Sequence, residues 1–392
     1  MSAAPPDPKP RIFSLHFTLV VTSGLCYFTA LAMLNPVLPD YIEQSLGHGS
    51  IAVGIGVGAF AVGAILLRPL AGRVGDTMGR RVLIIGGALI VSLSTAAYGL
   101  VHALWFLVLI RILSGFGEAG FFVGAATMIT DLAPIERRGE AVSYWSVAVY
   151  GGLSLGPVLG SVLHGHGHYG WVWVVSAALS LLAALIGFLT VEVARDAPTE
   201  RPKHLIHRAA VPPGSVLFLG LISLAGFIAF VPLYVQDGVD VSAGLIFAIY
   251  GVLILAVRVF GARVPDQLGG RLTASLALSL IAAGTATMAL WQSVAGLVVG
   301  TVVFAGGMSL MYPALLLLAL HGVNDSERAS VVGTFSSFFD ASQGLGAFIC
   351  GVVVAVVGSD SGAFTAGAVC ALAGLIVLRA RGGAMRTSAA TA

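Results

Sequence analysis

The sequence is poor in charged residues and in cysteine. Only 10% of its 392 residues are Asp, Glu, Lys or Arg, whereas soluble domains carry roughly 25%. A soluble fold of this length needs a polar surface that such a sequence cannot supply. The three cysteines, Cys26, Cys350 and Cys370, have no spacing typical of a disulfide framework or a metal site. No nucleophile–base pair, metal cluster or phosphate-binding loop is recognisable, so nothing favours an enzyme, and we expect no cofactor and no bound metal.

Apolar residues are abundant instead, at 57% of the chain. They gather into runs of about 20 residues or more, the length that an α-helix needs to cross a bilayer. The first run is too long for a signal peptide and lacks a cleavage site, so we expect it to be retained. Twelve runs are predicted to span the membrane: 14–39, 51–71, 82–101, 103–130, 141–163, 171–193, 214–236, 242–262, 272–291, 293–320, 329–357 and 362–380.

The basic residues are distributed unequally between the two sides of these runs. Nineteen of the 20 Lys and Arg residues lie in the two tails, in the even-numbered connections or at the ends of the runs on that side, and the opposite side has acids and histidines. The positive-inside rule therefore predicts that both termini are cytoplasmic, in a multi-pass protein of the plasma or inner membrane. The formal net charge of +2 gives no indication of nucleic-acid binding.

A long polar stretch and an internal repeat divide the chain into two halves. "RVGDTMGRR" at 73–81 recurs as "RVPDQLGGR" at 263–271, an offset of 190 residues, and Arg68 upstream recurs as Arg258. Two parallel halves are a known transporter architecture, with the substrate site between them. We predict five segments: a tail at 1–13, a first six-helix bundle at 14–193, a linker at 194–213, a second bundle at 214–380 and a tail at 381–392.

The motif "GRVGDTMGRR" resembles the loop signature of the major facilitator superfamily, with Thr77 where the family usually has Arg. The resemblance implies an all-α polytopic membrane protein with twelve transmembrane helices in two pseudo-symmetric six-helix bundles. It also implies a gate that closes the cytoplasmic side, in which Arg80 pairs with an acid at the end of the fourth span, here Asp131. The implied gate residues are Gly72, Asp76, Gly79, Arg80, Arg81, Asp131, Asp266 and Arg271.

The fifth run carries a second signature. Gly152, Gly156, Pro157 and Gly160 resemble the antiporter motif of the family's exporters, and glycines four apart let a neighbouring helix approach closely. The segment 137–146 is similar to the drug and metabolite efflux branch. These resemblances favour export over uptake.

Three ionisable residues lie deep in apolar runs, where each costs roughly 2.5–3.5 kcal/mol or more at a helix centre. Arg111 and Glu118 are seven residues apart and share one helix face, and the family links an Arg at this position to proton coupling. Asp340 lies on a stripe of small and polar residues typical of a helix that lines a wet cavity: Gly333, Ser336, Ser337, Gln343, Gly344 and Ala347. We predict that these three ionisable residues carry proton coupling, with structural ion pairs within the bundle as the alternative.

Other polar and aromatic residues are candidates for the cavity wall. Asn35, between Pro36 and Pro39, predicts a bent first helix at the cavity, and Asp40 is placed at the outer mouth. With Arg111, Glu118 and Asp340 all ionised the buried charge is −1, which favours neutral or cationic cargo. The remaining candidates are Tyr150, Phe230, Tyr234, Tyr312, Phe338, Phe339 and Gln343.

The outer loop "HGHGHYGW" at 164–171 alternates His with Gly. His164, His166 and His168 could bind a transition metal, but no acid or Cys is near in sequence, so we favour an exposed, pH-sensitive loop. Together these patterns predict a proton-coupled transporter that exports small amphipathic molecules, working as a monomer in the lipid bilayer. A proton-coupled importer of a metabolite such as a sugar or organic acid is the alternative, and a receptor or enzyme built on the same bundle is a third.

Overall fold

The computed structural model describes residues 13–134, 137–165, 168–192, 207–236, 239–260, 264–323 and 328–380. Every regular element within these ranges is helical. The first half contains α1 Leu15–Ala32, α2 Leu38–Asp40, the π-helix η1 Tyr41–Ser45, α3 Ser50–Met78, α4 Arg80–Ala96, the 3₁₀ helix η2 Ala97–Leu100, α5 Leu104–Leu132, α6 Arg138–His164 and α7 Tyr169–Phe188. The second half contains the 3₁₀ helix η4 Arg208–Ala210, α8 Val211–Gln236, α9 Ala243–Phe260, α10 Val264–Leu268, α11 Gly270–Leu290, α12 Val294–Leu320, α13 Arg328–Val357 and α14 Ser361–Ala380.

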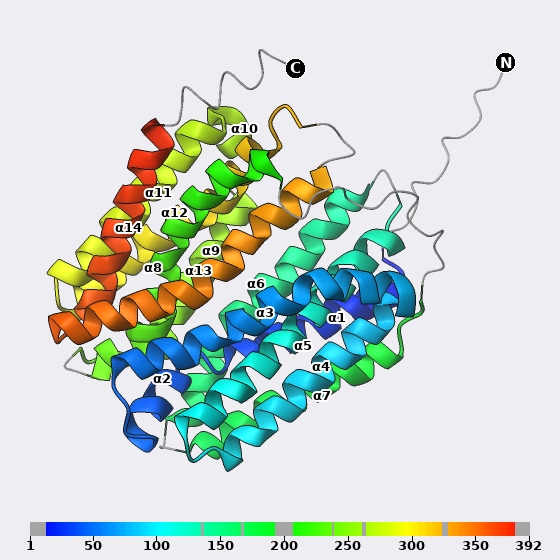
Figure 1. Cartoon of the computed structure of the whole chain (residues 1–392), viewed down its shortest axis with the longest axis horizontal. Helices are drawn as coiled ribbons and strands as arrows, with labels where there is room; N and C mark the ends of the chain where they lie inside the picture. Colours follow the sequence, from blue (N-terminus) through cyan, green and yellow to red (C-terminus); the bar gives the residue numbers. More distant parts are fainter. Residues whose placement is uncertain are drawn as a thin grey trace.

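The long helices match the apolar runs of the sequence. Eleven helices in the described chain are long and apolar enough to cross a membrane, and α9 adds a shorter apolar stretch, Ala243–Val257, at the eighth predicted run. They lie roughly alongside one another in Figure 1, with α2 near one end of the bundle and the end of α14 at the other. We call these ends the α2 side and the termini side.

The two halves repeat one packing scheme. In the first, α1 packs against α6, α4 against α5 and α7, and α3 against α5. In the second, α8 packs against α13, α11 against α12 and α14, and α9 against α12, which are the same pairings in the same order. The halves meet where α3 packs against α13, where α6 packs against α9, and where α2 meets α8. The internal repeat of the sequence is therefore matched by a repeat of the packing.

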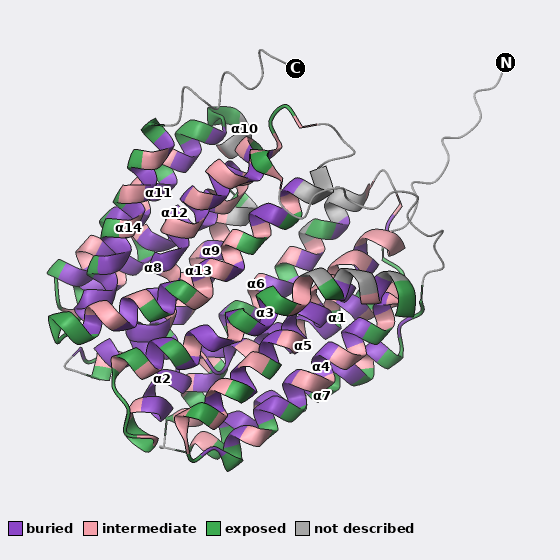
Figure 2. Ribbon diagram, viewed as in Figure 1, coloured by how far each residue is buried: buried purple, intermediate pink, exposed green. Residues whose placement is uncertain are grey.

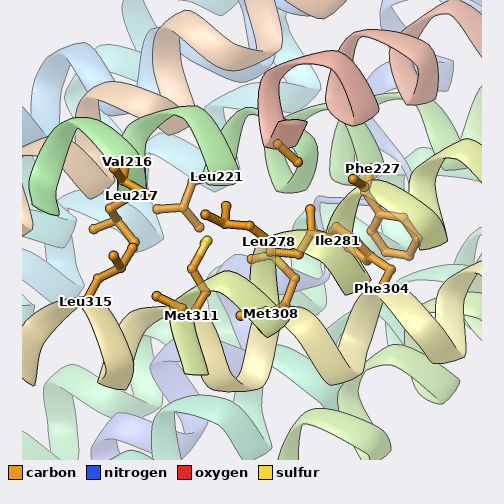
Figure 3. Packing of buried hydrophobic residues seen from close by; sticks show 14 of the residues in the cluster. Val216, Leu217, Leu221, Phe227, Leu278, Ile281, Phe304, Met308, Met311 and Leu315 are labelled. Atoms are coloured by element: carbon orange, nitrogen blue, oxygen red, sulfur yellow. The ribbon is translucent and has the colours of Figure 1, made fainter. Parts of the chain in front are cut away.

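Each half has an apolar core, and a third core joins the two. The core of the second half lies between α8, α11 and α12 and includes Leu221, Leu278 and Met311 (Figure 3). A separate cluster combines residues of α2 and the segment before it with residues of α8, all almost fully buried: Met33, Leu34, Val37, Leu38, Ala229, Phe230 and Leu233. Because this cluster draws on both halves, it closes the α2 side.

Large apolar side chains also cover the outward faces of the bundle. Leu93, Trp105, Val162, Val252 and Ile376 are each more than 60% exposed, and Figure 2 shows exposed residues along the lengths of the helices as well as at their ends. Apolar faces of this extent are found on proteins that lipid surrounds. The chain is a multi-pass membrane protein.

The first predicted span is broken where the sequence predicts a bend. Helix α1 ends at Ala32, and α2 begins at Leu38. Pro36 lacks an N–H and cannot continue the α-helical hydrogen bonding, and turn-like bonds such as Asn35 N to the Ala32 carbonyl, 3.1 Å, replace it. This break lets α2, which ends at Asp40, pack against α8.

Candidate functional site

Three charged side chains meet between the halves. Arg68 of α3 places Nη2 3.2 Å from Oε2 of Glu118 on α5, and Nη1 3.0 Å from Oδ2 of Asp340 on α13. The side chains of Arg68, Glu118 and Asp340 are 20%, 11% and 8% exposed. One guanidinium thus holds one carboxylate from each half, in the planar two-sided arrangement that arginine forms well.

Small residues bring α3 and α13 close enough for this contact. A Cβ built on Gly58 would lie 2.5 Å from the Gly344 carbonyl oxygen, and one on Gly54 would lie 2.5 Å from that of Ala347. At both positions a side chain would force the helices apart. The small-residue stripe predicted on α13 therefore places its backbone directly against α3 on the α2 side of Asp340.

The same stripe opens on the other side of Asp340. Gly333 and Ser337 are exposed, whereas Ala347 is fully buried. These residues recur at helical spacing with Asp340, which is 6% exposed. On the α2 side of Asp340 the stripe packs against α3, so the prediction that it lines a wet cavity needs correction there. Asp340 lies at the point along α13 where the stripe changes from packed to exposed.

Arg68 lies near the end of the second predicted span, 51–71, and was counted with the basic residues of the cytoplasmic side, so its place in the cluster was not predicted. The available signal was its recurrence as Arg258 in the second half. Arg68 also changes the charge of the interior. With Arg68, Arg111, Glu118 and Asp340 ionised the total is zero, not the −1 expected from three groups, and the electrostatic preference for cationic cargo loses its basis.

Arg111 faces α3, as its seven-residue spacing from Glu118 predicts, but binds other groups. Its Nε donates to the Gly56 carbonyl at 3.1 Å and its Nη2 to the Val57 carbonyl at 3.0 Å. Its guanidinium carbon lies 4.8 Å from the centre of the Phe60 ring. Arg111 joins α5 to α3, while Arg68 supplies the counter-charge of Glu118.

Aromatic rings border the charge cluster on the first half. The Arg68 guanidinium carbon lies 5.3 Å from the centre of the Phe122 ring, a cation–π distance. Phe122 in turn meets Phe28 and Trp145 edge-on, with ring centres 6.3 Å apart in both cases. The predicted aromatic cavity residues lie on the second half apart from Tyr150, and Phe28, Phe122 and Trp145 were not among them.

The predicted cavity residues have different surroundings. Phe230 and Tyr234 are 0% and 6% exposed and lie in packed cores, where the Tyr234 hydroxyl donates to the Met288 carbonyl at 3.3 Å. Tyr312 lies 6.3 Å, centre to centre, from Phe339 in an edge-on contact. Asn35 is in the break after α1, and the remaining three, Tyr150 on α6 with Phe338 and Gln343 on α13, are partly buried.

The loop after α3 forms an ion pair and a helix cap. Arg80 Nε is 3.0 Å from Asp131 Oδ2, with side chains 8% and 2% exposed, so the pairing expected from the motif is present. Gly79 has a φ of 94°, a conformation that favours glycine. Directly after it, the backbone N–H groups of Arg80 and Arg81 donate to the Glu192 carboxylate, each at 2.9 Å.

Glu192 was not predicted, because it follows α7 more than a hundred residues away in sequence. In the second half, Arg271 donates to the Arg379 carbonyl at 3.2 Å. The predicted gate residues Gly72, Asp76 and Asp266 lie outside the residues whose side chains the structure describes.

The predicted antiporter motif on α6 faces α1. A Cβ on Gly156 would lie 2.5 Å from the Thr29 carbonyl oxygen and 2.6 Å from the Ala32 Cβ, and one on Gly152 would lie 2.7 Å from the Thr29 nitrogen. Pro157, inside α6, carries the carbonyl that lies near Gly244 of α9. Gly160 packs against Met33. This glycine face brings α6 and α1 together within the first half.

The histidine loop meets an acid that the sequence did not place beside it. His164 Nε2 lies 3.1 Å from Asp40 Oδ2, and the His164 side chain is 23% exposed. The expectation of an exposed loop without a nearby acid is therefore wrong for His164. Among the described residues no group of three His, Cys, Asp or Glu side chains is placed to hold a metal, and His166 lies outside them.

The chain matches known proteins over nearly its whole length. The family model for the Major Facilitator Superfamily matches residues 20–346 and 215–390. An uncharacterized MFS-type transporter of Salmonella typhimurium is 28% identical over 378 residues, covering 93% of this chain and 96% of the relative. One of Burkholderia mallei is 26% identical over 393 residues, covering 96% and 95%. This chain belongs to the Major Facilitator Superfamily and is a membrane transporter, not an enzyme.

Solved structures show the same fold at low sequence identity. A POT family transporter in complex with a thioalcohol-conjugated peptide superposes with a TM-score of 0.80 at 12% identity, covering 94% of this chain and 96% of the other. The nucleoside transporter NupG gives 0.76 at 14%, covering 95% and 100%. The human organic anion transporter MFSD10 gives 0.69 at 19%, covering 93% and 98%. These likenesses bear out the predicted fold class.

Proposed function

We propose that this transporter exports small amphipathic molecules in exchange for protons, by alternating access. The observation that carries the proposal is Arg68, which holds Glu118 of the first half and Asp340 of the second at 3.2 and 3.0 Å. A movement of the halves apart at this level has to break one of the two contacts. The carboxylate that loses Arg68 then faces the aromatic and polar surroundings of the cavity without its counter-charge.

Loss of the counter-charge is what allows a proton to bind. Burial disfavours the charged form of a carboxylate, and a neighbouring arginine favours it. One proton moving down 100 mV supplies about 2.3 kcal/mol, and a tenfold difference in proton affinity between two states corresponds to about 1.4 kcal/mol. A change of ten- to a hundredfold in proton affinity is therefore enough to couple the cycle.

The proposed direction of transport rests on the glycine motif of α6 and on the unequal distribution of Lys and Arg between the two sides of the membrane. The glycine face of α6 resembles the exporters' antiporter motif, and it packs backbone to backbone on α1. The excess of Lys and Arg on the termini side supports cytoplasmic termini in a plasma or inner membrane. In the observed conformation an apolar cluster shared by the two halves closes the α2 side, and this supports a cycle in which cargo binds from the termini side.

The cargo we propose is neutral or zwitterionic as well as cationic. Arg68 balances part of the acidic charge, so the cavity has no strong preference against neutral molecules. The partly buried Phe122 ring offers flat apolar surface beside the ion pair, which suits an amphipathic molecule, and the buried rings of Phe28 and Trp145 pack behind it. A monomer contains the whole cluster, because all three charged residues belong to one chain.

Reconstitution in liposomes with an acidic lumen and an internal pH dye tests this proposal. A panel of drug-like cations, neutral amphiphiles, sugars and organic acids is added outside, one compound at a time. We expect at least one amphiphile to make the lumen more alkaline, because protons leave as cargo enters. Acidification of the lumen when cargo is added together with external acid would show symport instead and identify an importer.

A further inference from the structure

Another buried carboxylate lies at the α2 side, away from the cluster of Arg68, Glu118 and Asp340. Asp40, at the end of α2, is 5% exposed. The Tyr169 hydroxyl donates to its Oδ2 at 2.6 Å, and His164 Nε2 lies 3.1 Å from the same oxygen. The side-chain amide of Gln236 adds a further hydrogen bond. We call these four residues the Asp40 cluster.

The Asp40 cluster connects the two halves of the molecule. Asp40, His164 and Tyr169 belong to the first half, at the ends of α2 and α6 and the start of α7. Gln236 is the last residue of α8, in the second half. The cluster adjoins the mixed apolar core in which Leu38 and Tyr41 are buried together with Leu233, so the carboxylate is bound at the seam that has to open when the α2 side opens.

Several polar groups surround Asp40, and within the Asp40 cluster His164 is the histidine, the side-chain type that gains a charge when protonated near neutral pH. On its own segment, Tyr41 donates to the Val101 carbonyl at 2.7 Å, and Glu43 lies three residues further along. Helix α7 presents Tyr169, preceded by His168, and α8 presents the neutral Gln236. Helix α3 begins at Ser50 without a charged residue.

We propose that the Asp40 cluster is a proton-binding site separate from the cavity, which holds the α2 side closed when His164 is protonated. A protonated imidazole turns the contact to Asp40 into a charge-assisted pair, and such pairs are shorter and stronger than neutral hydrogen bonds. Acid on the α2 side then stabilises the closed conformation. This site controls which side opens and does not depend on the direction of transport.

The direction of the pH effect follows from the protonation state of Asp40. Burial alone would raise the pKa of Asp40, but hydrogen bonds from His164, Tyr169 and Gln236 hold it below the ordinary value of 3.8. Asp40 therefore remains ionised while the pH falls through the range in which histidine gains its proton, about 6.5 for an unperturbed side chain. The closed state is strengthened on acidification until Asp40 itself is protonated.

Distance measurements between the two halves test the site without any cargo. Spin labels are attached in a background without native cysteines to Q44C on η1 and V357C at the end of α13, both exposed positions on the α2 side. In nanodiscs, lowering the pH from 8 to 5.5 is expected to shift the distance distribution toward the closed, shorter component. D40N is expected to raise the open-to-closed ratio about tenfold at pH 5.5, the size of a lost hydrogen bond to a charged group.

Matched variants separate this site from general charge effects. H164Q keeps a donor but cannot be protonated, so we expect it to abolish the shift on acidification. D240N removes the same charge from an exposed position on the same side and is expected to behave like the parent. An unchanged open-to-closed ratio in D40N, or a full response to acid in H164Q, would overturn the proposal. Because the readout is a distance, the test stands whether or not export is found.

Discussion

Replacement of Arg68 with glutamine is expected to reduce cargo-driven proton flux to the level of empty liposomes. The change leaves Glu118 and Asp340 buried side by side without a counter-charge, and removing one partner of a buried ion pair costs about 3–5 kcal/mol. Since Arg68 keeps 20% of its side-chain surface exposed, we expect the lower end of that range. Thermal unfolding in detergent and the luminal pH dye measure the two effects separately.

Two further variants show whether stability and transport depend on the charge of Arg68 or on the geometry of its guanidinium. Arg68→Lys keeps the charge but has no planar fork for two carboxylates, so we expect a stable protein with weakened flux. The double variant Arg68→Gln with Glu118→Gln removes one charge of each sign and is expected to recover much of the stability, yet not the flux. An Arg68→Gln protein that transports as well as the parent would remove Arg68 from the mechanism.

Replacement of Asp131 with asparagine is the second large effect that we expect. It removes the carboxylate that lies 3.0 Å from Arg80 Nε, in a place where the two side chains are only 8% and 2% exposed. Such a break costs about 3–5 kcal/mol, and the depth of burial favours the upper part of the range. Thermal unfolding of the purified protein should show a clear loss of stability, together with reduced transport.

Glu192→Gln, a smaller change in the same loop contacts, is compared with Asp131→Asn in the same stability measurement. It keeps the acceptor oxygen but removes the charge that caps α4 through the backbone N–H groups of Arg80 and Arg81. Loss of a helix cap costs about 1 kcal/mol, so Glu192→Gln should be the milder change. If Asp131→Asn were as stable as the parent while Glu192→Gln was strongly destabilised, the loop would depend on its cap and not on its ion pair.

The fold could be predicted from the sequence because lipid imposes a simple rule. A segment that crosses the bilayer has to be apolar for about 20 residues and has to satisfy its own backbone hydrogen bonds, which only a helix does. The spans thus follow from composition. The repeat at an offset of 190 residues indicated two similar halves, and the packing scheme repeats accordingly.

The site could be predicted only in part, because it depends on which helices meet. Glu118 and Asp340 were recognisable as charges in apolar surroundings, but nothing local in the sequence says that α3 lies between α5 and α13. Arg68 is close enough to the end of its span to be counted with the loop, and its long side chain reaches back to the cluster. For the same reason Asp40 and His164, 124 positions apart in number, gave no sign of their contact.

Sequence patterns also misplaced the aromatic residues. Phe230 and Tyr234 are typical of a cavity wall by composition, but they are buried in packed cores. Phe122 was not among the predicted cavity residues, yet its ring lies 5.3 Å from the Arg68 guanidinium carbon. An apolar ring in a membrane helix can face lipid, core or cavity, and only the packing of its helix decides between them.

Proton coupling through Glu118 and Asp340 is the central claim, and one comparison tests it most directly. The parent, Glu118→Gln and Asp340→Asn are reconstituted in liposomes with an acidic lumen, and the internal pH and the exchange of a labelled cargo are followed together. We predict that the parent makes the lumen more alkaline as cargo enters, whereas both variants exchange cargo downhill without proton movement. Proton flux equal to that of the parent in both variants would contradict the account.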